Sequence, residues 1–392
     1  MTEFALSPAA RRRSLLVCLA AALSIAMTLG LTWPLLSLIL EAQGVDSGLI
    51  GLSSASQTIA ILVIVPVTPW LMARVGTVRL MAICFAGTVA TILLLPVFPN
   101  VYAWFPIRFL MGGFVEVLFI AADIWVNQIA EPKTRGRIIG LYAFVLSAGF
   151  AVGPLIIGVT GIDGWLPFVV GATMIGLGAL PLLWAAGVVP PIEGRASGRL
   201  WYFLRIAPML MFAGMMFGLI DSSFLPLLPI YALDMGLGAT ASVTLLTVLT
   251  IGAVIGQLPI GWAADRMDQR LMIIGCVVVI MAGCLALPLV IGDVVLLWAD
   301  MLVMGAAMGG FYTIGMIMLG DRFKGADLAA ANAVFVVTWG LGSVGGPTVT
   351  GAAMEHWGAE AMPYVVIAFC LAYLPLAVAR YLRKQRRGGD DA

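Results

Sequence analysis

Long segments without a charged residue constrain this chain more than any other feature of its sequence. Residues 14–40, 47–73, 138–162 and 235–264 contain no Asp, Glu, Lys or Arg, and five similar runs lie elsewhere. Each run approaches or exceeds the ~20 apolar residues that cross the hydrocarbon core of a bilayer as a helix. Because lipid offers no hydrogen bonds, the backbone of such a segment must bond to itself, as it does in a helix. The sequence therefore predicts an all-α membrane protein with many spans.

Composition agrees, because only 10% of the residues are charged, whereas about 25% is usual in soluble proteins. Two longer apolar regions are less simple. One contains Pro96–Asn100, which is a loop signal and divides the region into two helices. The other contains a single charge, Asp221, and is interpreted as one span. Twelve transmembrane helices are predicted, at about 14–40, 47–72, 80–96, 101–127, 138–160, 165–186, 206–231, 241–263, 271–291, 295–319, 328–352 and 361–381.

The basic residues predict the orientation, since Lys and Arg favour the cytoplasmic side of a membrane. With twelve spans and a cytoplasmic N-terminus, 20 of the 21 basic residues fall on that side, and the exception is Arg108. Both termini are therefore expected in the cytoplasm. Arg11–Arg13 precede an apolar run that is long enough to span and lacks a cleavage pattern. The first helix is thus expected to stay in the membrane.

The second half of the chain repeats features of the first. Trp33–Leu36 corresponds to Leu225–Leu228, 192 residues later, and Gly149–Pro154 corresponds to Gly342–Pro347 at a spacing of 193. Two pseudo-symmetric six-helix halves are therefore predicted, and transporters built from such repeats bind substrate near the membrane midplane. The predicted parts are a cytoplasmic N-terminal segment (1–13), the N-terminal half (14–186), a cytoplasmic linker (187–205), the C-terminal half (206–381) and a cytoplasmic tail (382–392).

Residues 261–270, GWAADRMDQR, resemble the loop motif G-x-x-x-D-R-x-G-R-R of the major facilitator superfamily of transporters, with Asp268 in place of the second glycine and Gln269 in place of the next arginine. In the equivalent loop of the first half, Ala73 stands where the motif has Asp. Arg108 and Gly112 match the R-x-x-x-G motif of helix 4. The resemblance implies the twelve-helix fold of that superfamily and a gating loop that contains Asp265, Arg266 and Arg270.

A glycine–proline motif and four short signatures narrow the resemblance. The helix-5 motif, which is often linked to antiporters, recurs in helix 11, so no direction of transport is inferred. The two copies, expected to pack helices, are Gly149, Gly153 and Pro154, and Gly342, Gly346 and Pro347. The signatures Glu41–Gly44, Asp123–Asn127, Gly256–Gly261 and Ala331–Ala333 are similar to those of the YcaD-like branch. Such carriers lie in the bacterial inner (plasma) membrane and include riboflavin importers and copper importers.

Charges within the spans are the main candidates for a functional site. Arg108, Glu116 and Asp123 fall with Gly112 and Phe119 within an arc of about 80° on one helix. Intramembrane charges are costly and usually face a protein interior or a water-filled cavity. We therefore predict substrate-binding or proton-coupling roles for this stripe. An alternative for Asp123 is pairing with Arg135 or Arg137. Two further carboxylates are candidates for the same roles, Asp221 and Asp300.

Other side chains could contact cargo. The pairs Met211 and Met215, and Met304 and Met308, are spaced i, i+4, and thioethers suit Cu(I). Methionine also fills gaps in apolar cores, and the single histidine, His356, lies in a predicted outer loop, so a metal site is not favoured. Aromatic and amide side chains could hold a flat organic substrate or simply pack: Trp33, Gln57, Phe119, Trp125, Gln257, Tyr312, Asn332 and Trp339.

Several functions lack their sequence signatures. A single histidine excludes a two-histidine zinc motif, there is no G-x-S-x-G, and no G-K-[ST] follows Gly112–Gly113. An enzyme, a cofactor and a nucleic-acid partner are therefore not expected. The prediction is a monomeric secondary transporter in the lipid bilayer. It would move a small vitamin-like or drug-like solute by alternating access, coupled to protons or another ion. A copper importer and a non-transporting sensor or assembly factor stay open, the latter because of Ala73.

Overall fold

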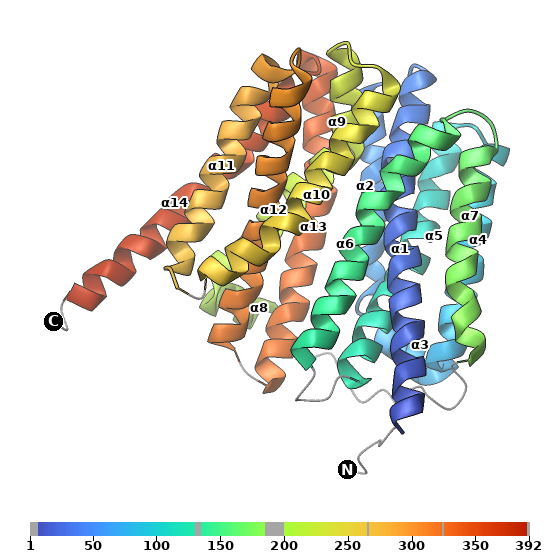
Figure 1. Cartoon of the computed structure of the whole chain (residues 1–392), viewed down its shortest axis with the longest axis horizontal. Helices are drawn as coiled ribbons and strands as arrows, with labels where there is room; N and C mark the ends of the chain where they lie inside the picture. Colours follow the sequence, from blue (N-terminus) through green and yellow to red (C-terminus); the bar gives the residue numbers. More distant parts are fainter. Residues whose placement is uncertain (1–6, 130–134, 185–199, 265, 324, 390–392) are drawn as a thin grey trace. The chain divides into compact units, whose positions relative to one another are not determined.

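The computed structural model describes residues 7–129, 135–184, 200–264, 266–323 and 325–389, and these residues contain helices but no β-strand. Figure 1 shows the chain. The helices are α1 (Pro8–Ala42), α2 (Ser47–Ile64), α3 (Thr68–Val75), α4 (Thr77–Val97), α5 (Val101–Ile129), α6 (Arg135–Thr160), α7 (Leu166–Ala179), the 3-10 helix η1 (Leu180–Trp184), α8 (Leu200–Ile206), α9 (Pro208–Asp234), α10 (Ala239–Ala264), α11 (Gln269–Val290), α12 (Val294–Arg322), α13 (Gly325–Trp357) and α14 (Ala361–Gly389).

Ten helices in the described ranges are long and apolar enough to cross a membrane. They are α1, α2, α4, α5, α7 continued by η1, α9, α10, α11, α12 and α14. Helix α6 contributes a shorter apolar helix, Phe144–Thr160, and the glycine-rich α13 is not among the ten. The prediction of an all-α, multi-pass membrane protein is thus confirmed. The count of twelve spans and the orientation of the termini stay predictions.

One predicted span is too long, and the predicted linker ends in a short helix. The span predicted over 47–72 ends earlier, because α2 stops at Ile64 and a separate helix, α3, begins at Thr68. Pro66 and Pro69 explain the break, since proline has no N–H and restricts the residue before it. The predicted linker 187–205 is also not entirely a loop, because α8 begins at Leu200.

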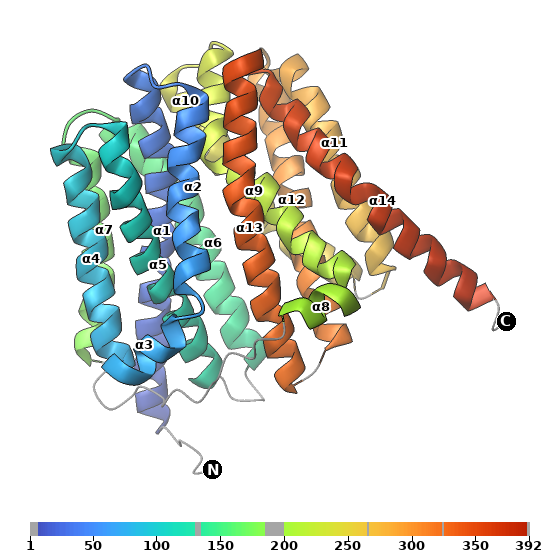
Figure 2. The same ribbon diagram turned by 180° about the vertical axis from the view of Figure 1, so that it is seen from behind.

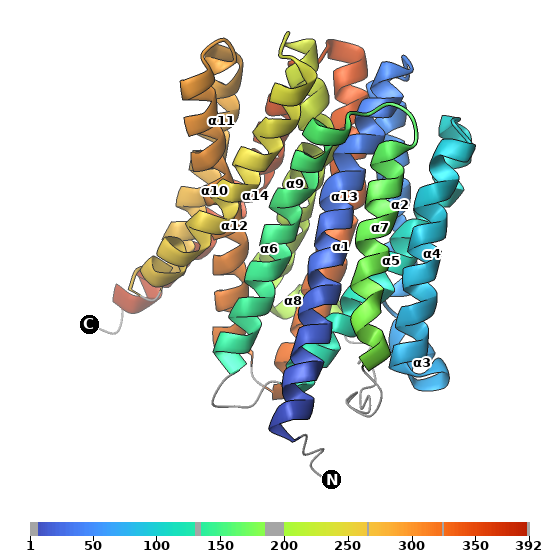
Figure 3. The same ribbon diagram turned by 45° about the vertical axis from the view of Figure 1, so that its right-hand side comes forward.

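Contacts divide the chain into two compact units, each described by itself. Unit 1 consists of Met1–Ile39 and Ser56–Ala196, and unit 2 of Leu40–Ala55 and Ser197–Ala392. In unit 1, α4 packs against α5 and α7, and α1 lies between α6 and α7 (Figures 1 and 3). In unit 2, α9 packs against α13 and α14, and α12 packs against α10 and α11 (Figure 2).

Glycine allows α6 to approach α1 closely in unit 1. A methyl group at Gly149 would lie 2.7 Å from Cβ of Ala26, and one at Gly153 would lie 2.5 Å from the carbonyl carbon of Gly30. Both distances are too short for a side chain. Within lipid the hydrophobic effect does not drive helices together. Close backbone contact of this kind is therefore a major source of helix association. Pro154 follows directly within the same helix.

The second copy of the motif lies at the corresponding contact in unit 2. A methyl group at Gly342 of α13 would overlap the carbonyl oxygen of Met215 in α9, and one at Gly346 would overlap that of Leu219. Pro347 again follows within the helix. The repeat in the sequence is therefore accompanied by a repeat in packing, since each unit has one pair of helices joined through the motif glycines.

Replacing Gly342 by alanine tests this contact. The added methyl group must push α13 away from α9, and overpacking of this kind costs about 1–3 kcal/mol. We expect Gly342→Ala to lower the thermal unfolding temperature of the purified protein in detergent. The control is Gly275→Ala in α11, where no atom lies within 4 Å of the new methyl group. Alanine there should leave stability unchanged or slightly raised. An equal loss in both variants would contradict the packing role.

Candidate functional site

Helix α5 carries the charged stripe predicted from the sequence. The side chain of Arg108 is completely buried, with 0% of its surface exposed, and Glu116 and Asp123 are half-buried. All three lie within the apolar span Val101–Val126. Burying a charged group away from water is strongly unfavourable unless the protein surrounds it with polar groups. A chain that keeps three such groups on one transmembrane helix therefore has a functional-site candidate there.

Asp123 has polar neighbours from three helices of unit 1. It interacts electrostatically with Glu116 on α5, with Cys18 on α1 and with Tyr142 on α6. We call these four residues the Asp123 cluster. Cys18 and Tyr142 are buried. Sequence analysis missed both, because neither has a spacing that links it to α5. The alternative partners of Asp123, Arg135 and Arg137, have side chains outside the part of the structure that is described.

Two predicted substrate contacts in unit 1 are used in helix packing. The indole Nε1 of Trp125 donates a hydrogen bond of 2.6 Å to the hydroxyl of Ser14, joining α5 to α1, and the ring is only 1% exposed. The ring of Trp33 on α1 lies 6.2 Å from that of Phe150 on α6. Each tryptophan therefore connects α1 to another helix.

Gln57 and Phe119 have different surroundings. Gln57 is 3% exposed and packs against Gly112 of α5, where a methyl group would lie 2.9 Å from its Cγ. Its amide oxygen is buried and accepts no hydrogen bond in the described structure. Phe119 is half-buried on α5. An unpartnered buried amide oxygen costs free energy, so Gln57 is a candidate for binding a donor group of a ligand.

Unit 2 has its own carboxylates within apolar helices. Asp221 on α9 is half-buried. Asp300 on α12 has one buried oxygen without a hydrogen-bond partner in the described residues, and it interacts electrostatically with Tyr231 of α9 and Cys284 of α11. The hydroxyl of Tyr231 is also buried and likewise lacks a hydrogen-bond partner there. Sequence analysis missed Tyr231, because a tyrosine within an apolar span gives no signal of its neighbours.

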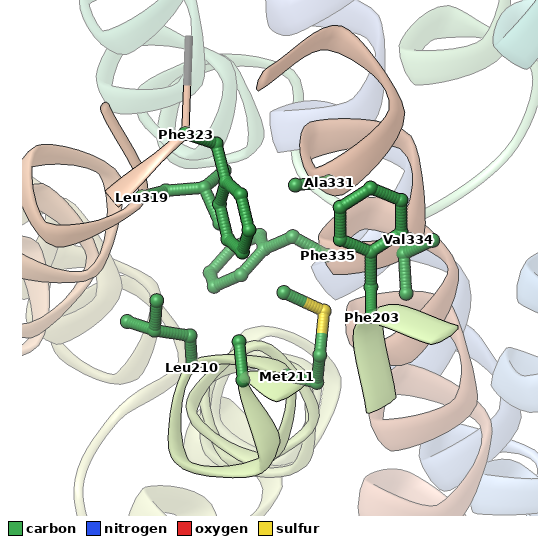
Figure 4. Close-up of a cluster of buried hydrophobic side chains, with 9 residues drawn as sticks. Phe203, Leu210, Met211, Leu319, Phe323, Ala331, Val334 and Phe335 are labelled. Carbon is green, nitrogen blue, oxygen red and sulfur yellow. The ribbon is translucent and has the colours of Figure 1, made fainter. Parts of the chain in front are cut away.

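The paired methionines lie in different surroundings. Met211 belongs to an apolar cluster that includes Phe203, Leu210, Leu319, Phe323, Val334 and Phe335 (Figure 4). The sulfur of Met304 lies 4.0 Å from that of Cys284. Met215 is half-buried and Met308 is buried. The described residues contain no group of three or more His, Cys, Asp or Glu side chains that could hold a metal ion.

The remaining predicted contacts lie on three helices of unit 2. Tyr312 on α12 has its ring 5.1 Å from that of Phe217 and 6.3 Å from that of Phe335. Gln257 on α10, and Asn332 and Trp339 on α13, are half-buried. Phe217, Tyr312 and Phe335 form an aromatic group, of which the sequence analysis named only Tyr312.

The loop motif has a local structural role at its altered position. Asp268 is the N-cap of α11, and its carboxylate accepts a hydrogen bond of 2.9 Å from the backbone N–H of Arg270. An aspartate at this position stabilises the start of a helix, which accounts for the departure from the glycine of the motif. The guanidinium of Arg266 lies 3.9 Å over the ring of Trp262. Asp265 lies outside the described residues.

Comparisons with known proteins identify the family. The family model described as "Major Facilitator Superfamily" matches residues 18–249 and 210–391. The chain is 24% identical over 365 residues to the uncharacterized MFS-type transporter YfkF of Bacillus subtilis, covering 90% of this chain and 91% of that protein. It is 23% identical over 369 residues to the uncharacterized MFS-type transporter YcaD of Escherichia coli, covering 92% and 94%.

Solved structures agree in fold. The nucleoside transporter NupG has a TM-score of 0.76 at 14% identity, covering 95% of this chain and 99% of that one. A bacterial homolog of the human lysosomal transporter Spinster, in an inward-facing and unoccupied conformation, has a TM-score of 0.78 at 13% identity, covering 97% and 98%. The family match extends over most of the chain, and the predicted resemblance to YcaD is confirmed. The chain therefore belongs to the major facilitator superfamily, and it is a multi-pass membrane transporter rather than an enzyme.

Proposed function

We propose that this protein works as a monomer in the bacterial inner membrane, where it moves a small organic solute by alternating access with protons as the coupling ion. The observation that carries the proposal is the placement of Arg108, Glu116 and Asp123 on one transmembrane helix, buried or half-buried within an apolar span. Membership of a transporter superfamily supports the general class, and the charged stripe supports the finer statement.

Proton coupling is supported by the Asp123 cluster. Carboxylates inside membrane spans commonly take part in proton relays. Glu116 and Asp123 act on each other electrostatically, so a proton bound by one changes the cost of ionising the other. Tyr142 belongs to a different helix, α6, and also interacts with Asp123. A change of charge at Asp123 would therefore alter an interaction between α5 and α6, as a coupling step requires. Asp221 and Asp300 are candidates for the same role in unit 2.

An organic solute is supported by the chemistry of the side chains. A guanidinium such as that of Arg108 forms paired hydrogen bonds with carboxylates and similar planar anions. In the same unit, the buried amide oxygen of Gln57 lacks a donor among the described residues. In unit 2, the partly exposed rings of Phe217 and Tyr312 are of the type that suits a flat molecule. These features favour a polar or anionic compound that contains a ring.

Copper import is the second candidate, and the contact of 4.0 Å between the sulfurs of Met304 and Cys284 favours it. Against it, Met211 packs among aromatic and aliphatic side chains, as methionine does in ordinary cores. The stripe on α5 also offers hard oxygen and nitrogen groups, whereas Cu(I) prefers soft sulfur ligands. A non-transporting sensor would share the fold, and Ala73 in the first-half loop is the feature that favours it.

The coupling role of the carboxylates can be tested in proteoliposomes. A thermal-shift screen of vitamins, nucleosides, drugs and copper salts first identifies a solute. We then expect Glu116→Gln and Asp123→Asn to reduce accumulation driven by a pH gradient at least about tenfold. The reason is that an amide, unlike a carboxylate, cannot take up and release a proton. Exchange of solute without a gradient should persist. The control is Asp163→Asn, which removes an exposed carboxylate between α6 and α7.

Accumulation at the level of the control in both carboxylate variants would refute coupling through the Asp123 cluster. A solute that stabilises the wild-type protein but never crosses the membrane would instead support a sensor.

The nature of the cargo can be tested by comparing two sets of variants. We expect Arg108→Lys to weaken solute binding about tenfold or more, because an ammonium group cannot reproduce the paired hydrogen bonds of a guanidinium. The paired substitutions Met211→Leu and Met215→Leu should leave solute binding and cellular copper unchanged. Both proteins should first show the wild-type circular dichroism spectrum. A copper deficit in the methionine variant, together with normal solute uptake, would favour the copper importer.

A further inference from the structure

A basic pocket in unit 2 lies apart from the buried carboxylates of the proposed transport site. It has a volume of about 610 Å³ and is formed at the ends of α9, α10, α11 and α12 and by Arg380 of α14. Four arginines line it, together with two aspartates: Arg266, Arg270, Arg322, Arg380, Asp268 and Asp321. Among the described residues that line the pocket, cationic side chains therefore outnumber anionic ones. The arginines come from three helices and from the loop before α11.

Three of these arginines are held by backbone carbonyl groups. Nη1 of Arg270 donates to the carbonyl oxygen of Arg380 at 2.9 Å, and Nη1 of Arg266 donates to that of Trp262 at 3.0 Å. Nη2 of Arg322 donates to the carbonyl oxygen of Ile206. A guanidinium has five N–H donors, so one such bond fixes its position and leaves most donors for another acceptor.

Each of the two carboxylates accepts a hydrogen bond from a neutral donor. Asp268 caps the N-terminus of α11 through the backbone N–H of Arg270. Asp321 accepts a hydrogen bond of 2.8 Å from the side-chain amide of Gln269. Four guanidinium groups and two carboxylates therefore line the pocket among the described residues, which leaves an excess of positive charge. The arrangement leaves room for an added anion.

The start of α9 contributes further positive potential. Residues Ala207 to Leu210 line the pocket, and α9 begins at Pro208 without a side-chain cap on its first turn. The N-terminus of a helix carries a partial positive charge, which suits anions such as phosphate. Pro208 has no N–H, and the N–H groups of Leu210 and Met211 donate to the carbonyl oxygen of Ala207, so α9 contributes mainly through its potential. The apolar cluster of Figure 4 includes Ala207 and Leu210, so packed side chains support this wall of the pocket.

We propose that this pocket binds a phosphate group. Guanidinium groups match phosphate oxygens in charge and in hydrogen-bond geometry, and the four arginines converge on one concave site. The surroundings favour the headgroup of an anionic phospholipid as the source. The pocket lies where candidate membrane spans end, and Arg266 stacks on Trp262, an exposed residue of the type enriched at membrane interfaces. Basic pockets between transmembrane helices bind such headgroups.

The purified protein in detergent provides the test, read out by native mass spectrometry and by thermal unfolding. The probes are phosphatidylglycerol, phosphatidylcholine and inorganic phosphate. The pocket variant is Arg270→Gln with Arg322→Gln. The control variant is Arg74→Gln with Arg79→Gln, which removes the same charge from two exposed arginines of unit 1. Arg266→Gln with Arg380→Gln is a second pocket variant, used if the first unfolds without ligand.

We expect the wild-type and control proteins to retain phosphatidylglycerol in preference to phosphatidylcholine. The pocket variant should lose that preference about tenfold or more, since each arginine near anionic lipid contributes appreciably to binding. Stabilisation by millimolar inorganic phosphate without lipid retention, lost in the pocket variant alone, would support the phosphate site and assign it to a free anion. An equal loss in the control variant, or no response to any phosphate compound, would overturn the proposal.

Discussion

A peptide group in hydrocarbon must find its hydrogen-bond partner within its own segment, and the structure depends on this constraint. The long apolar runs satisfy it as helices. Even polar side chains in these helices bond locally: the hydroxyl of Thr28 donates to the carbonyl oxygen of Ser24 at 2.7 Å, and that of Thr88 donates to Cys84 at 2.8 Å. Once backbone and hydroxyl groups are satisfied inside each helix, few polar groups are left to join one helix to another.

Helix association must then come from close fit, and the glycines supply it. In unit 1, α6 meets α1 at Gly149 and Gly153, and in unit 2, α13 meets α9 at Gly342 and Gly346. At these four positions the partner helix leaves no space for a side chain. The glycine–proline motif thus forms one such close contact in each unit.

Much of the fold could be predicted because hydropathy and proline act locally. The apolar runs predicted where the helices lie. The predicted span 47–72 was too long because the break at Pro66 was not recognised. The stripe on α5 could be predicted for the same reason, since the spacing of Arg108, Glu116 and Asp123 fixes their shared face. Asp268 is also a local signal, because an aspartate directly before a helix is a usual cap.

The rest of the candidate site depends on which helices are neighbours, and spacing within one helix does not contain that information. Cys18 and Tyr142 meet Asp123 from α1 and α6, and Tyr231 meets Asp300 from α9. Trp125 shows the same limit. It lies close to the charged stripe in the sequence and was therefore predicted to contact substrate, yet its indole N–H donates a hydrogen bond to Ser14 of α1. The basic pocket was missed because its arginines had already been explained by membrane topology.

The arginines of this protein therefore have two different physical roles. Arg108 lies fully buried inside a span, where the cost of removing its charge from water must be offset by polar groups or by a ligand. Arg270 and Arg322 lie near the ends of spans, where water and headgroups are close and the cost of keeping a charge is low. The buried position of Arg108 suits a group whose interactions change during the proposed transport cycle. The positions of Arg270 and Arg322 suit groups that hold helix ends together through the proposed shared anion. The sequence predicts which side of the membrane the second set lies on, but it does not predict that these arginines meet in one pocket. The packing of α9, α11, α12 and α14 brings them together.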